Sequence, residues 1–115
     1  MHKGVHLSQY QGSHYWAVIF SSRRTLHSEQ QYEETANRMV ELAKQQAGFL
    51  GIESARDSEG FGITVSYGKD EASIGEWKSH AEHIFAQKMG RAEWYQSFKT
   101  RICKVEREYG FEASK

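Results

Sequence analysis

The sequence predicts an α+β domain of the ferredoxin-like plan, with one antiparallel four-stranded sheet and both helices on one face of it. Strand and helix patterns follow the order β-α-β-β-α-β along the chain. The 115 residues contain no proline, repeat or linker, and this length corresponds to a single domain. The first strand is apolar on both faces, so each face needs cover. The two helices can cover only one face of the sheet. A second copy of the sheet would cover the other face in a two-fold dimer.

Composition excludes several classes of protein. Basic and acidic residues number 15 each, so the net charge is zero and gives no case for binding nucleic acid or an anionic membrane. The single cysteine, Cys103, cannot form an internal disulfide, which favours a reducing compartment. No signal-peptide core or membrane-length apolar run is present. We therefore expect a cytoplasmic protein with neither nucleic acid nor membrane as partner.

The first half of the chain begins with a polar, glycine-containing segment, residues 1–13, which we expect to be a mobile arm. The stretch HYWAVIFSS, residues 14–22, is aromatic and β-branched and predicts a strand. Ser28 and Gln31 then match a capping box, which starts a helix. That helix has one apolar stripe and is expected to end at Gly48. The stripe consists of Tyr32, Ala36, Met39, Val40 and Ala43.

The second half predicts a hairpin, a helical region and a last strand. Residues 49–57 and 61–68 are strands around a turn in which Gly60 takes a positive φ. Asp70 caps a helix that carries Ile74 and Trp77. Ser79 and Glu82 form a second capping-box pattern, which predicts a break with a new turn starting at His80 and a stop at Gly90. Residues 97–111 form an overlong β segment. The domain thus spans 14–111, followed by a tail, 112–115.

The sequence resembles the antibiotic biosynthesis monooxygenase-like family of the dimeric α/β-barrel superfamily. The resemblance covers roughly residues 14–111 and rests on YWAVIFSSRRT, GFLGIESARD, GITVSYGKDEASIGEWK, HIFAQKMGRAEWY and RICKVERE. It implies a homodimer in which two ferredoxin-like protomers form a barrel, with a pocket between each sheet and its own helices. Some relatives use that pocket without metal or flavin to oxygenate quinols or polycyclic phenols, and others degrade haem. In relatives of this subgroup an aromatic often stands where this chain has Gly68, which implies a larger pocket or a lost wall.

Two histidines, His80 and His83, are three residues apart, so one helical face can present both. A metal site needs further ligands, and no such set is recognisable here. We expect no metal and no cofactor. The resemblance places His83 near a position where relatives have a histidine beside the pocket, whereas His80 reads as a surface residue. His83 is therefore the candidate base.

The sequence matches the haem site of haem-degrading relatives poorly. Haem-degrading relatives have an asparagine on the first strand, a tryptophan in the second helix and an iron-ligating histidine ten residues after it. Trp77 can match the tryptophan, but Gln87 stands at the histidine position and residues 14–22 contain no asparagine.

Aromatic side chains are more numerous than a small core requires, although most are expected to pack in the core or the dimer interface. Tyr67 and Trp77 are the better pocket candidates, with Tyr67 as a catalytic phenol beside His83. Trp16, Trp77, Phe85 and Arg91 are the candidate substrate-binding residues. Arg91 fits an ion pair better than a ligand clamp, and Cys103 is expected to be packed and inert.

The sequence hypothesis is a cofactor-independent monooxygenase that oxidises a small quinol or polyphenol with O₂ in an aromatic pocket between sheet and helices. One alternative is a non-catalytic module that binds a small aromatic metabolite. The other is a haem-binding or haem-degrading protein.

Overall fold

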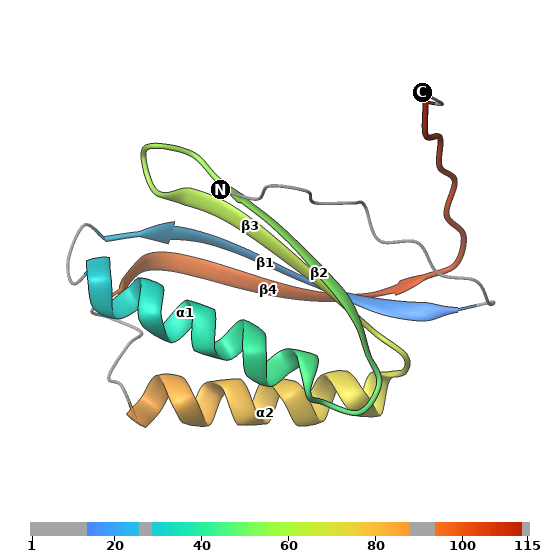
Figure 1. Cartoon of the computed structure of the whole chain (residues 1–115), viewed down its shortest axis with the longest axis horizontal. Helices are drawn as coiled ribbons and strands as arrows, with labels where there is room; N and C mark the ends of the chain where they lie inside the picture. Colours follow the sequence, from blue (N-terminus) through green and yellow to red (C-terminus); the bar gives the residue numbers. More distant parts are fainter. Residues whose placement is uncertain (1–13, 26–28, 88–93, 114–115) are drawn as a thin grey trace.

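The chain folds into one four-stranded antiparallel sheet with two helices on one side (Figure 1). The computed structural model describes residues 14–25, 29–87 and 94–113, and from 83 to 87 the backbone alone. The sheet order is β2-β3-β1-β4, so the predicted ferredoxin-like fold class is confirmed. The elements are β1 (Tyr15–Arg24), α1 (Glu29–Lys44), β2 (Phe49–Arg56), β3 (Phe61–Gly68), α2 (Glu71–Gln87) and β4 (Tyr95–Val105). The predicted arm 1–13, the Ser28 cap and the Gly90 stop lie outside the described residues.

The two faces of the sheet differ in the side chains they carry. Directly paired residues share a face, and Val18 pairs with Ser66 beneath α1 and α2. On this helix side β3 presents only small residues, Gly62, Thr64, Ser66 and Gly68. The larger row of β3 lies on the opposite, open side: Phe61, Ile63, Val65 and Tyr67. Since Phe61 and Ile63 are each 40% exposed, the open side has apolar surface that the described residues do not cover.

Two local predictions are confirmed, the Gly60 turn and the Asp70 cap, whereas the predicted helix end at Gly48 is wrong. Gly60 closes the β2–β3 hairpin with φ 95°. Helix α1 ends at Lys44, four residues before Gly48, which has φ 84° and lies directly before β2. The backbone N–H of Ser73 donates to Asp70 Oδ1 at 2.8 Å, which is an N-cap of α2. This hydrogen bond lowers the pKa of the Asp70 carboxyl.

The predicted break at Ser79 is wrong. Helix α2 runs from Glu71 to Gln87 without interruption, and Ser79 is exposed in its middle. Glu82, the residue expected to complete the capping box, instead accepts a hydrogen bond from Lys78 Nζ at 3.0 Å. An i,i+4 pair of this kind supports a continuous helix, so the Ser-x-x-Glu spacing here is no start signal.

The last strand is shorter than predicted. It begins at Tyr95 and ends at Val105, and residues 106–113 continue without regular structure rather than as strand to 111. A register shift between Arg23 and Arg24 places Tyr95 opposite Arg24, and Phe98 opposite Ser22. Tyr95 and Phe98 therefore share a face although they are three residues apart.

We predict that Gly48→Ala destabilises the protein by about 1–3 kcal/mol, because a Cβ would meet Ser73 Cβ at 2.8 Å and φ is positive. The matched control is Gly75→Ala, since a Cβ at this helical glycine meets nothing within 4 Å. That change should stabilise by about 0.5–1 kcal/mol. Urea unfolding of both variants checks the pair, and equal effects would contradict the packing described.

Ser79→Ala should leave stability unchanged or raise it by up to about 0.5 kcal/mol, because alanine is the better residue in an exposed helix interior. A loss of about 1 kcal/mol in thermal or urea unfolding would restore the capping interpretation.

Candidate functional site

A small cavity lies where the end of α1 and the start of α2 meet the sheet. Val18, Ser66 and Gly68 form its floor, and Ala43, Ile74 and Trp77 are among the helical residues around it. Its volume is about 30 Å³. That corresponds to about one water molecule, so this cavity does not hold a flat aromatic ligand as it stands.

Gly68 does not enlarge the cavity. A Cβ on Gly68 would lie 2.9 Å from Cγ1 of Ile74, so the isoleucine fills the space that a side chain at this position would take. Ile74 is 5% exposed and holds α2 close to the sheet. The implied gain of pocket volume at Gly68 is therefore not found.

An apolar strip continues from the cavity along β1 and β4 on the helix side. It consists of Val18, Phe20, Phe98 and Ile102, which we call the helix-side floor. Helices α1 and α2 lie mainly over β1, β2 and β3. As a result Phe98 and Ile102 are 42% and 43% exposed, although they face the side that the helices occupy. An exposed apolar strip that adjoins a tryptophan-lined cavity is a surface on which a flat ligand can stack.

One end of the floor is closed by aromatic rings. Tyr95 contacts Phe20 and Phe98 at ring-centroid distances of 5.5 and 5.7 Å, and Phe20 contacts Phe98 at 5.4 Å. Tyr95 also meets the ring of Tyr32 from α1 edge-on, at 5.8 Å. Burial, together with the neighbouring Tyr32, raises the pKa of the Tyr95 phenol. Tyr95 therefore stays protonated and donates its hydroxyl hydrogen towards Tyr32 at 3.4 Å.

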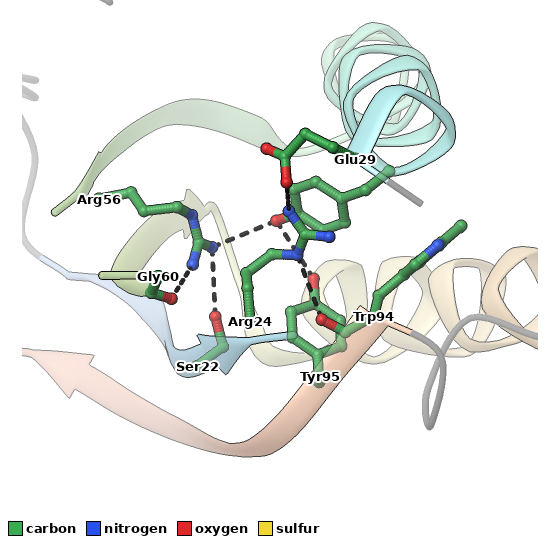
Figure 2. A network of polar contacts seen from close by, with 8 residues as sticks. Ser22, Arg24, Glu29, Arg56, Gly60, Trp94 and Tyr95 are labelled. Carbon is green, nitrogen blue, oxygen red and sulfur yellow. Dashed lines mark hydrogen bonds and ion pairs between the residues drawn. The ribbon is translucent and has the colours of Figure 1, made fainter. Parts of the chain in front are cut away.

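Two arginines, Arg24 and Arg56, contact Tyr32, and both are drawn with their labelled partners in Figure 2. The guanidinium of Arg24 stacks on the ring, with Cζ 3.5 Å from the centroid, and Arg24 is only 4% exposed. It donates to the carbonyl of Trp94 and to Glu29 Oε1, each at 3.2 Å. A buried guanidinium held by a ring, a carbonyl and a carboxylate fixes the start of α1 against β4.

The second arginine crosses the sheet. Arg56 donates to the carbonyl of Gly60, to Ser22 Oγ at 3.3 Å and to the Tyr32 hydroxyl at 3.2 Å (Figure 2). It lies flat over Gly62, where a Cβ would come within 2.7 Å of its Cζ. The network thus joins the hairpin, β1 and α1, and it sets the position of the Tyr95 ring at the end of the floor.

The predicted site residues fall into three groups. Trp16 and Trp77 are both half-buried and on the helix side. Tyr67 borders the cavity, but it pairs with Ala17 on the open side, and its hydroxyl donates to Glu53 Oε1 at 2.7 Å. His83 and Phe85 lie in the last part of α2, residues 83–87, where only the backbone is described. Arg91 lies outside the described residues.

The floor and the arginine network were not anticipated from the sequence. Phe98 and Ile102 alternate regularly along β4, but the side they face follows from their pairing with Ser22 and Val18, and Tyr95 joins them on that side only through the register shift. Gly62 was the available signal for Arg56, because a glycine within a strand often marks a close approach of another group.

Among the residues whose side chains are described, 14–25, 29–82 and 94–113, there is no group of three or more histidine, cysteine, aspartate or glutamate side chains suited to a metal ion. Neither α1 nor α2 is long and apolar enough to cross a membrane.

Comparison with known proteins places the chain in a family. It is 48% identical over 98 residues to the uncharacterised protein YqjZ of Bacillus subtilis (strain 168), which is 85% of each chain. The chain belongs to the family of YqjZ. No model of a known protein family matches the sequence.

Solved structures show the same fold at low identity. The chain is similar to SnoaB, a cofactor-independent oxygenase from Streptomyces nogalater, with TM-score 0.63 and 10% identity over 84% of this chain and 97% of that one. A candidate antibiotic biosynthesis monooxygenase from Nitrosomonas europaea gives TM-score 0.64 and 16% identity over 89% and 99%. Protein SO0527 from Shewanella oneidensis gives 0.66 and 16% over 82% and 93%. The predicted antibiotic biosynthesis monooxygenase-like fold is thus confirmed.

We predict that Arg24→Lys destabilises by about 1–3 kcal/mol, because lysine cannot stack on Tyr32 and donate to two acceptors at once. The neighbouring Arg23 is exposed, so Arg23→Lys should stay within about 0.5 kcal/mol of the wild type. Thermal unfolding of the two variants measures the difference, and similar losses would show that the buried network contributes little.

Proposed function

We propose that the protein binds a small electron-rich aromatic compound, a quinol or polyphenol, on the helix-side floor and oxidises it with O₂ without a cofactor. The observation that carries this proposal is the exposure of Phe98 and Ile102 on the side of the sheet that the helices occupy. The fold, shared with a cofactor-independent oxygenase, supports a small-molecule role. Fold alone does not fix the chemistry.

The proposed chemistry needs a base and an apolar surface. Once ionised, a phenol gives electrons to O₂ directly. For a phenol with a free ring carbon, one oxygen atom enters the ring to give a quinone and the other leaves as water, so the substrate supplies all four electrons. His83 is the proposed base, since histidine titrates near pH ~6.5. Tyr67 has no role in this proposed reaction, because its hydroxyl donates to Glu53 on the open side.

The proposal includes a homodimer. The open side carries Phe61 and Ile63, each 40% exposed, and β1 is apolar towards both sides. A second sheet packed on this side would bury them, and the contact should exceed the roughly 1,000 Å² of a biological interface.

Oxygen uptake with a panel of benzo-, naphtho- and anthraquinols tests the function. His83→Ala should lower the rate by about 10²–10⁴, as loss of a general base does, whereas His80→Ala should leave it nearly unchanged. Equal losses at both positions would favour a metal site.

Ile102→Ser tests the floor itself. We expect KM for the quinol to rise by about 10-fold or more, because an apolar contact contributes about 1–3 kcal/mol. Cys103→Ser is the matched control, since Cys103 is the next residue and faces the open side. Quinol binding without oxygen uptake would favour the non-catalytic module, and a Soret band on adding haem would favour the haem alternative.

A further inference from the structure

The segment that follows β4, residues 106–113, carries the two most exposed large apolar side chains among the described residues. Tyr109 is 87% exposed and Phe111 is 89% exposed. The segment has no regular secondary structure, and we call it the β4 arm. Aromatic side chains contribute most of the binding energy at many interfaces, so two exposed ones on one short segment indicate a contact surface.

The base of the β4 arm is anchored to the sheet. The hydroxyl of Tyr15, which is 8% exposed, donates to the carboxylate of Glu108. Tyr15 lies on the open side, opposite Val105. Figure 1 shows the arm rising from the end of β4 on the side away from both helices. The arm therefore leaves the sheet in a defined direction, towards the open side.

The other exposed apolar pair on the open side is at the far end of the sheet. Phe61 pairs with Arg23, near the end of β1, whereas the arm is anchored at Tyr15, where β1 starts. Ile63 lies next to Phe61 on the same face. A two-fold axis that crosses the strands would bring the arm of each copy to the Phe61 end of the other, twice in one dimer.

We infer that the β4 arm is an exchanged arm, which packs Tyr109 and Phe111 over Phe61 and Ile63 of a second copy of this chain. The inference rests on the dimer in the proposed function and adds which segment holds it and how the copies are oriented. Each aromatic side chain buries about 150–250 Å², so the four that two arms supply cover much of the roughly 1,000 Å² that a stable contact needs.

Sedimentation equilibrium of the full chain tests the exchange. The double variant Tyr109→Ser/Phe111→Ser should raise the dimer dissociation constant by about 10–100-fold. The control is Glu112→Ser, an exposed arm position without an aromatic ring, which should leave the constant unchanged. Circular dichroism of each variant verifies that the fold is retained.

Phe61→Ser, alone and combined with the double variant, tests the contact. If the arm meets Phe61, the two effects on the dissociation constant are less than additive. If Tyr109→Ser/Phe111→Ser leaves the dimer dissociation constant unchanged, the exchange is overturned while the dimer itself stands. Full additivity of the double variant with Phe61→Ser has the same meaning. A wild-type chain that is monomeric up to high micromolar concentration overturns both.

Discussion

A single sheet that is apolar on both faces is the constraint on which the rest of this structure depends. β1 turns Trp16, Val18 and Phe20 to one side, and Tyr15, Ala17 and Ile19 to the other. Apolar surface on both sides of a sheet has to be removed from water on both sides. Two helices cover one side in part, and the chain supplies no second layer for the other among its described elements. The two sides are thereby free to serve different purposes.

Small residues determine how the helices sit on the sheet. β3 presents glycine, threonine and serine to the helix side, so Ile74 of α2 packs directly against Gly68. Because Gly62 has no side chain, Arg56 can likewise cross the sheet to Tyr32. This close packing leaves a cavity of about 30 Å³ near Trp77, while the surface of β4 further along stays exposed. The proposed ligand surface is therefore an open floor rather than an enclosed pocket.

The sequence predicted the fold well because the signals were local. The element order, the Gly60 turn and the Asp70 cap each depend on a few neighbouring residues, and the structure confirms them. The Ser79 pattern failed for a related reason: a capping box is a short motif, and the Lys78–Glu82 pair occupies the carboxylate that the motif would use. The spacing of residues in the sequence does not show whether Glu82 caps a helix at Ser79 or pairs with Lys78.

The candidate site was harder to predict because it depends on pairing between distant strands. The register shift at Arg23 and Arg24 brings Tyr95 and Phe98 to one face, which no alternation in the sequence displays. The position of Tyr67 was hard to predict for the same reason. The side of the sheet that it faces depends on pairing with Ala17 rather than on its place at a strand end. Arg24 and Arg56 likewise acquire their roles only when the hairpin, β1 and α1 meet.

We propose that the two sides of one sheet have separate roles, one for a ligand and the other for a second copy of the chain. Ile102 lies on the helix side and Ile63 on the open side. Methyl NMR spectra of the isoleucine-labelled protein report on both in one sample. Added naphthoquinol under anaerobic conditions should shift the Ile102 methyl signal and leave that of Ile63 in place, and protein dilution should do the reverse. Ligand and dilution acting on the same methyl group would contradict this separation of the two sides.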